Sequence, residues 1–149
     1  MAIGEICNRE VVIVQRDTTV QDAAKLMREH HVGALVVVKE VSGKRHPVGL
    51  VTDRDLVVEV LAPELVASVI TVGDIMQPKP ATVLETTGVF ETIQLMRDKA
   101  VRRVPVVDEH GVLIGIVALD DLLSLLADEL SELSALVSRE QKKETDSRR

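Results

Sequence analysis

The sequence predicts an α+β fold in which two β-α-β-β-α units pack sheet to sheet around a pseudo-twofold axis, followed by an extended C-terminal helix. The main observation is an internal repeat, since Leu-Met-Arg at residues 26–28 returns at 95–97, and the opening residues 3–7 resemble residues 72–76. A unit of about sixty residues cannot bury both faces of a three-stranded sheet alone. The chain is 46% hydrophobic but only 1% aromatic, so we expect a core of Val, Leu and Ile.

In the first unit, short apolar runs bounded by turn residues predict strands, and apolar residues at helical spacing predict helices. Thr19 stands where a helix cap is expected, and Pro63 ends or kinks the last helix of the unit. The turn between the second and third strands falls at residues 42–44. We expect strands at residues 11–14, 34–38 and 48–51, and helices at about 20–30 and 53–61.

The second unit repeats this order with a loop three residues shorter between its last two strands. We expect strands at residues 81–84, 104–107 and 113–117, and helices at 89–99 and from Leu119 onward. The predicted organisation is a first domain at residues 1–62, a linker at 63–71, a second domain at 72–130, and a helical extension with a frayed tail at 131–149.

The final helix carries a leucine stripe that is longer than one unit needs. Its apolar residues recur at spacings of three and four, which is typical of a helix face. The stripe covers the core of its own domain or packs on a partner chain, and both interpretations remain open. From Gln141 onward the residues are polar and mixed in charge, so we expect this end to be frayed.

Composition excludes several classes of function. The formal net charge is −6, whereas binding to duplex nucleic acid needs a basic surface, and scarce aromatics disfavour single-strand binding. The single cysteine, Cys7, excludes an internal disulfide framework. No signal peptide and no apolar run of about 18 residues is present. We therefore expect a cytoplasmic protein that binds neither nucleic acid nor membrane.

The strand-to-helix corner at residues 49–55 is the most informative stretch. Thr52 and Asp55 have the spacing of a helix cap, in which a hydroxyl and a carboxylate satisfy free N–H groups. The same groups can hold a ligand, because a carboxylate accepts hydrogen bonds from the hydroxyls of a sugar. The corner recurs at residues 115–121; the corner alone favours the cap, and the rest of the chain favours a binding role.

Together these elements resemble a tandem pair of CBS domains, also called a Bateman module, over about residues 1–130. The resemblance rests on the opening Val-Gly-Asp-Ile-Met at 72–76, the run Arg-Arg-Val-Pro-Val-Val-Asp at 102–108, and the two corners. It implies a regulatory module that binds AMP, ADP, ATP, NAD or S-adenosylmethionine in one or both of two clefts between the copies. It also implies a short stand-alone protein that pairs as a homodimer, acts on an unidentified target protein, and uses no catalytic cofactor.

The resemblance assigns each cleft a set of residues from both copies. The first cleft takes Thr52 and Asp55 with Arg54 close by, and its base wall is formed by Met76, Ala81 and Val101. The second cleft takes Asp120 and Asp121 with Arg102 and Arg103 for phosphate, and its base wall is formed by Cys7, Val12 and Val32.

Each cleft departs from the family pattern in one respect. Ala118 occupies the position where a hydroxyl residue is usual, so the second cleft lacks that group. Gly33 and Ala34 stand at the positions that correspond to the two arginines, so we expect the first cleft to lack an arginine pair. Alternatively, Arg102 and Arg103 form a solvated strand edge or pair with the acidic surface.

Other constellations have simpler explanations. His30 and His31 end a helix and lack further ligands at metal spacing, and Cys7 corresponds to Met76 in the repeat, so a buried apolar role is expected for it. No nucleophile–base set has a recognisable spacing. We therefore expect a nucleotide sensor that is not an enzyme, and the alternative is a constitutive homo-oligomeric scaffold with vestigial clefts.

Overall fold

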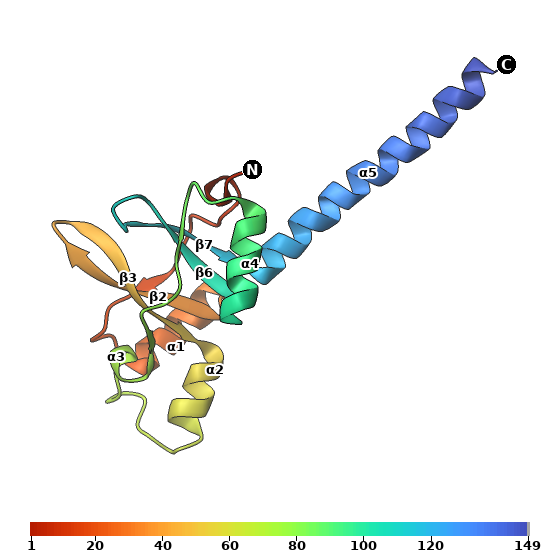
Figure 1. Ribbon diagram of the computed structural model, residues 1–149. Helices are drawn as coiled ribbons and strands as arrows, with labels where there is room; N and C mark the ends of the chain where they lie inside the picture. Colours follow the sequence, from red (N-terminus) through yellow and green to blue (C-terminus); the bar gives the residue numbers. More distant parts are fainter. Residues whose placement is uncertain (149) are drawn as a thin grey trace. The chain divides into compact units, whose positions relative to one another are not determined.

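The computed structural model describes residues 1–148 and shows a mixed α/β chain (Figure 1). Residues Met1–Val117 form one compact unit, and a second unit begins at Ala118. The first repeat contains η1 (Ile3–Glu5), β1 (Ile13–Val14), α1 (Val20–His30), β2 (Ala34–Val41), β3 (Lys44–Thr52), α2 (Asp53–Leu56) and η2 (Val57–Leu61). The second repeat adds α3 (Val72–Ile75), β4 (Gln77–Pro78), β5 (Val83–Leu84), α4 (Val89–Lys99), β6 (Arg103–Val107) and β7 (Leu113–Ala118). The last residue of β7, Ala118, already belongs to the second unit. The predicted fold class is confirmed.

The strands form two sheets, one for each repeat. The first sheet has the order β1-β2-β3-β4, and the second has the order β5-β6-β7. In both sheets the first strand runs parallel to the second, as in the pairs β1–β2 and β5–β6. Strand β4 follows the start of the second repeat and pairs antiparallel with β3 of the first. The four-stranded sheet is therefore completed by the other repeat.

The opening segments of the two repeats are exchanged in a symmetric way. The backbone N–H of Ile3 donates to Thr87 O at 2.7 Å, and that of Val72 donates to Thr18 O at 2.7 Å. Each of these two donors and each of the two acceptors is 69 residues from its counterpart. This pairing shows the predicted pseudo-twofold relation at the level of single hydrogen bonds and makes the two repeats one folding unit.

Helices α1 and α4 have the predicted bounds because their end signals are local. The Thr19 side chain accepts a hydrogen bond from Asp22 N at 3.2 Å and caps α1. Both helices end at a residue in the left-handed region, His31 at φ 53° and Ala100 at φ 54°. The chain thus reverses into the next strand at the same place in each repeat.

The strand lengths differ from the prediction. Strands β2 and β3 form a longer hairpin, with Ser42 and Gly43 at φ 54° and 76° in its two-residue turn. Most of the added residues at the hairpin end are polar and exposed, among them Lys39, Glu40, Lys44 and Arg45, so hydrophobicity does not mark them. Conversely, β1 and β5 keep only two residues each.

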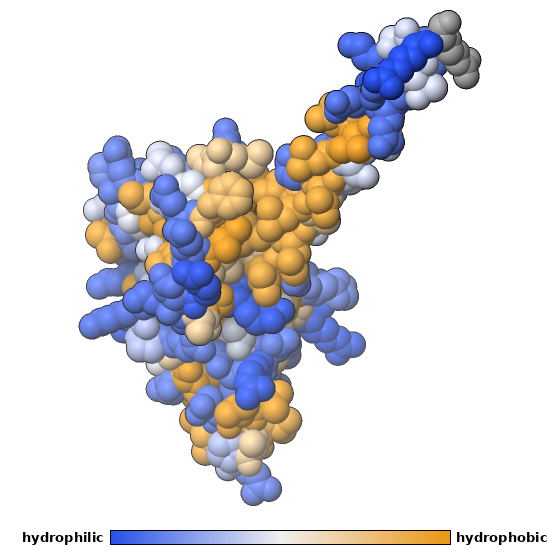
Figure 2. All heavy atoms as spheres, turned by 45° about the vertical axis from the view of Figure 1, so that its right-hand side comes forward, coloured by the Kyte–Doolittle hydropathy of each residue, from blue (hydrophilic) through white to orange (hydrophobic). Residues whose placement is uncertain are grey.

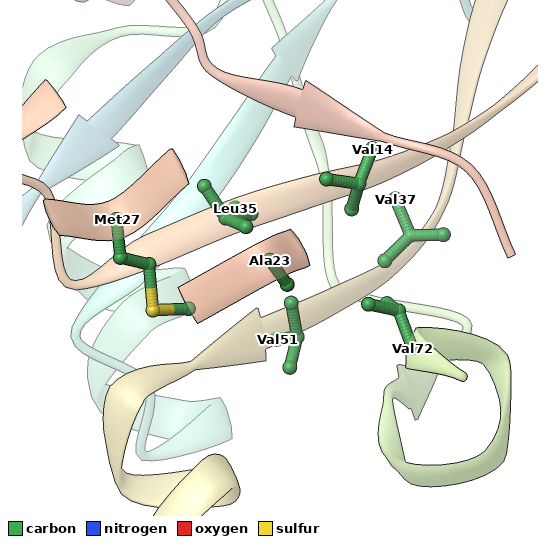
Figure 3. Close-up of a cluster of buried hydrophobic side chains, with 7 residues drawn as sticks. All are labelled: Val14, Ala23, Met27, Leu35, Val37, Val51 and Val72. Atoms are coloured by element: carbon green, nitrogen blue, oxygen red, sulfur yellow. The ribbon is translucent and has the colours of Figure 1, made fainter. Parts of the chain in front are cut away.

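The core beside the first sheet is aliphatic, as predicted, and Figure 3 shows its side chains converging from several elements. Leu35 and Val37 of β2 and Val51 of β3 are fully buried against α1. Val72 of the second repeat joins them, so the exchanged segment is anchored by burial as well as by hydrogen bonds. The complete cluster is Val14, Ala23, Met27, Leu35, Val37, Val51 and Val72.

The second unit is the long helix α5 (Leu119–Ser147), which has 29 residues. Helix α5 continues through residues 141–147, the segment that we expected to be frayed. Gln, Lys and Glu are good helix formers, and Arg148 and Glu144 form an ion pair at the spacing i, i+4. Among residues 1–148, neither α5 nor a shorter helix is apolar enough over a sufficient length to cross a bilayer.

Candidate functional site

The corner between β3 and α2 forms the reciprocal cap that the sequence predicts. Asp55 N donates to Thr52 Oγ1 at 3.2 Å, and Thr52 N donates to Asp55 Oδ2 at 2.9 Å. Both residues are half-buried. The cap uses one of the two carboxylate oxygens of Asp55 and only the acceptor capacity of the Thr52 hydroxyl. Capping and ligand binding are therefore compatible at this corner.

A cleft of about 510 Å³ opens beside this corner, within the volume range of small-molecule sites. Its residues come from both repeats. The first repeat supplies the end of β3 and the start of α2, and the second supplies Gln77 of β4 and the turn between α4 and β6. The lining residues are Leu50, Thr52, Asp53, Arg54, Asp55, Gln77, Ala100, Val101, Arg102 and Arg103.

The cleft concentrates cationic side chains on a protein that is acidic overall. Three arginines and two aspartates line it, against a net charge of −6 for the chain. Asp53 Oδ2 and Arg103 Nη2 both lie beside Gly33, where an added Cβ would be 3.1 and 3.4 Å from them. Because a guanidinium fork binds two oxygens at once, this set suits a phosphate or another planar anion.

The structure brings together four of the residues predicted for the first cleft, namely Thr52, Arg54, Asp55 and Val101. It also places Arg102 and Arg103 there, so the expectation that this cleft lacks an arginine pair is wrong. The left-handed Ala100 ends α4 and leads the chain past the Thr52 corner before β6 begins. Which corner this turn faces depends on how the repeats pack, and the repeat pattern alone does not encode that.

Two residues expected in the base wall of the first cleft, Met76 and Ala81, are not among those that line it within the described chain. The Met76 side chain instead lies against the Cα of Gly49 and packs on the core. Gln77, the next residue, takes the wall position because β4 pairs Gln77 with Leu50. Sequence reasoning missed Gln77, since no local signal announces a strand pairing between repeats.

Leu50, Asp53 and Ala100 also line the cleft and were not predicted, although the sequence carried usable signals for Asp53 and Ala100. Asp53 directly follows Thr52 and accepts a hydrogen bond from Arg54 N at 2.8 Å through Oδ1. Its position in the first turn of the helix was a usable signal. Ala100 corresponds to His31 in the repeat, and that correspondence could have marked it as a turn residue.

A second hollow of about 560 Å³ brings together Val12 and Val32 of the predicted second cleft. The other lining residues are Asn8, Glu10, Val11, Ile13, Leu26 and His30. Cys7 is not one of them in the described chain. Its Sγ lies near Gly4 O at 3.6 Å, and burial raises the pKa of the thiol above its ordinary value.

Asp120 and Asp121, predicted for the second cleft, lie in the first turn of α5. Asp121 Oδ2 accepts a hydrogen bond from Ala118 N at 3.0 Å, the counterpart of the Asp55 contact with Thr52. A ligand-binding role for this pair stays a prediction. Within residues 1–148, no group of three or more His, Cys, Asp or Glu side chains is arranged to hold a metal ion.

Comparison with known proteins gives concordant matches. The family model for the CBS domain matches residues 3–62 and 72–128. The uncharacterized protein MK0525 of Methanopyrus kandleri is 38% identical over 125 residues, which cover 84% of this chain and 62% of that protein. The chain thus spans less than two thirds of that relative's length.

Two solved structures have the same fold. A CBS-domain protein from Burkholderia ambifaria superposes with a TM-score of 0.74 at 32% identity, covering 86% of this chain and 96% of that one. The CBS domain protein PAE2072 from Pyrobaculum aerophilum, whose structure is a complex with AMP, superposes with a TM-score of 0.74 at 27% identity. That match covers 86% of this chain and 99% of the other.

Proposed function

This chain belongs to the CBS domain family, and we propose that it is a regulatory module that binds an adenine nucleotide in the cleft beside Thr52. One observation carries the proposal. The cleft unites a sugar-binding type of carboxylate, Asp55, with an arginine pair, Arg102 and Arg103, across the two repeats. The AMP complex of the Pyrobaculum aerophilum protein supports the choice of ligand.

Each part of a nucleotide has a matching group in the cleft. The ribose hydroxyls donate to the Asp55 carboxylate, and the Thr52 hydroxyl donates to the phosphate. Arg102 and Arg103 bind phosphate oxygens through their guanidinium groups. The apolar side chains of Leu50 and Val101 border the slot for adenine, which backbone groups can recognise without an aromatic residue.

The proposed action is regulatory rather than catalytic. A ligand held by Thr52 of the first repeat and by Arg102 of the second favours one arrangement of the repeats over others. Only such a difference in affinity between two arrangements can transmit a signal. We propose that the target is a second copy of the chain in a homodimer, an unidentified partner protein, or both.

Thermal unfolding of the purified full chain with AMP, ADP, ATP, NAD and S-adenosylmethionine tests the proposal. A ligand at about 100 times its Kd adds roughly 2.7 kcal/mol of stability. At about 3–4 °C for each kcal/mol, the midpoint rises by about 8–11 °C. The protein is first unfolded, dialysed and refolded, so that nucleotide carried over from expression is removed.

A matched pair of variants separates binding from capping. Asp55→Ala and Asp74→Ala remove equivalent contacts, because Asp74 Oδ2 accepts from Thr71 N at 3.0 Å in another Thr-x-x-Asp corner. Each loses about 1 kcal/mol of cap stability. Asp55→Ala should also abolish the ligand-induced shift, whereas Asp74→Ala should retain it. Equal shifts in both variants would exclude the cleft beside Thr52.

The second candidate is a constitutive assembly scaffold, which the exposed leucines of α5 favour. Under that function, no nucleotide raises the unfolding midpoint of the refolded protein. Solution scattering then also gives the same particle dimensions with and without nucleotide, whereas the sensor should change them.

A further inference from the structure

Helix α5 exposes an apolar stripe with the spacing of a coiled coil. Leu123, Leu126, Leu130, Leu133 and Val137 alternate at intervals of three and four, the pattern of heptad positions a and d. Their exposed fractions are 56, 40, 68, 59 and 53%. Figure 2 shows hydrophobic surface, in orange, along this helix as far as its hydrophilic end, in blue.

This exposure is costly for a helix of this length. At 1.5 Å per residue, α5 is about 43 Å long, and a helix without a partner gains little stability in water. An amphipathic helix forms when its apolar face is covered. The stripe therefore needs an occupant along residues 123–137.

The charge pattern along α5 identifies that occupant. Residues 119–138 carry five acidic side chains and no basic one, whereas residues 139–143 carry three basic side chains and one acidic. A parallel pair of helices would set the two acidic segments side by side, where they repel. An antiparallel pair sets the start of the acidic segment of one copy, at residues 120–124, beside the basic segment of the other.

We propose that α5 pairs with α5 of a second copy of this chain as an antiparallel coiled coil centred between Leu130 and Leu133. In this register Leu130 packs on Leu133 of the second copy, and Leu126 packs on Val137 of the second copy. The twofold axis repeats both layers, so the four most central stripe residues of each copy are covered. Asp120 and Asp121 are then level with Lys143 and Lys142 of the second copy.

The inference does not depend on nucleotide binding in the cleft. It specifies which surface joins two chains and in which direction they run. A heterologous partner would instead need a complementary charge pattern of its own, whereas the two ends of this helix already carry opposite charges.

Disulfide trapping in the full-length protein tests both the partner and the direction. In a Cys7→Ala background, chains with Leu126→Cys are oxidised alone or after mixing with chains that carry Val137→Cys. The antiparallel register separates the two residues 126 by about 16 Å along the axis, beyond the roughly 4–7 Å between Cα atoms that a disulfide spans. Covalent dimers should therefore form in the mixture and not with Leu126→Cys alone.

Charge variants show whether the stripe forms the contact. Leu130→Glu in both cysteine-bearing chains should slow cross-linking of the mixture at least tenfold, because it places a carboxylate in the central layer. Ser131→Glu adds the same charge one residue further, off the stripe, and should change the rate less than twofold. Circular dichroism and thermal unfolding verify that both variants keep their helix content and their folded first unit.

Each other outcome overturns the proposal. Efficient cross-linking of Leu126→Cys with itself means a parallel pair. No cross-linking in either sample means that the stripe contacts another protein. Equal effects of Leu130→Glu and Ser131→Glu mean that chains meet through a different surface.

Discussion

Substituting two repeat-related glycines should have unequal effects on stability. An added Cβ at Gly115 would lie 2.6 Å from the backbone oxygen of Asn8 and 2.7 Å from Cys7 Sγ. At Gly49 the nearest atoms belong to the Met76 side chain, with Gln77 O at 3.2 Å. The obstacle at Gly115 is backbone, whereas that at Gly49 is a flexible thioether.

The two substitutions should differ in their loss of stability because different atoms must move to admit the added Cβ. Asn8 O accepts from Ile116 N at 2.9 Å, and Asn8 N donates to Ile116 O at 2.9 Å, so displacing Asn8 strains two hydrogen bonds. With overpacking near the upper end of about 1–3 kcal/mol, because hydrogen-bonded backbone must move, and an entropic gain of about 0.5–1 kcal/mol from removing glycine, Gly115→Ala should lose about 2 kcal/mol. Gly49→Ala should stay within about 1 kcal/mol of the parent.

Urea denaturation of the full chain measures both values from the shift in midpoint at constant slope. Gly88→Ala is the control, because its added Cβ would meet Glu91 Cδ at an ordinary 3.7 Å. If Gly49→Ala destabilises the protein as much as Gly115→Ala, the distinction between backbone and side-chain obstacles is wrong. If neither substitution destabilises the protein, the opening segments of the repeats shift easily, and their contacts with the other repeat contribute little stability.

Two further predictions follow from shifted pKa values. Burial raises the pKa of Cys7 above its ordinary 9.0, so iodoacetamide should alkylate it more slowly in folded than in urea-unfolded protein at one pH; equal rates would contradict this. Backbone N–H donation from Val112 and His110 lowers the pKa of Asp108 below 3.8. Its stabilising effect should be present above that pH and disappear as the pH falls through the lowered pKa, so Asp108→Asn should approach the parent's stability in acid.

The parts of the fold that local signals determine were predictable. The capping residue Thr19 and the helical spacing after it predicted α1, and the helical spacing alone predicted α4 in the second repeat. The hairpin length was not predictable, because outer residues such as Glu40 and Arg45 are polar and exposed, and only their pairing with each other across the strands defines them. The repeat pattern therefore indicated the elements and their order, but not where the polar strands end.

The candidate site shows the same difference between residues that a local pattern predicts and residues that only tertiary packing brings together. Thr52 and Asp55 belong to one short segment, and their spacing revealed them. Gln77 and the arginine pair line the cleft only because the second repeat packs on the first. The residue spacing within one repeat does not reveal a residue that contacts the other repeat, whereas it does reveal a capping residue.

The exchanged opening segments connect the cleft to the contact between the repeats. Gln77 lines the cleft, its neighbour Met76 lies against Gly49, and β3 continues from Gly49 to the corner at Thr52. A nucleotide that draws the arginine turn toward Thr52 acts on this same strand and on the segment paired with it. Since a packed contact of this kind has few alternative arrangements, we expect a small displacement at the cleft to reach the contact between the repeats. We infer that ligand affinity and the stability of the exchange are coupled, which is the requirement for a sensor built from two copies of one unit.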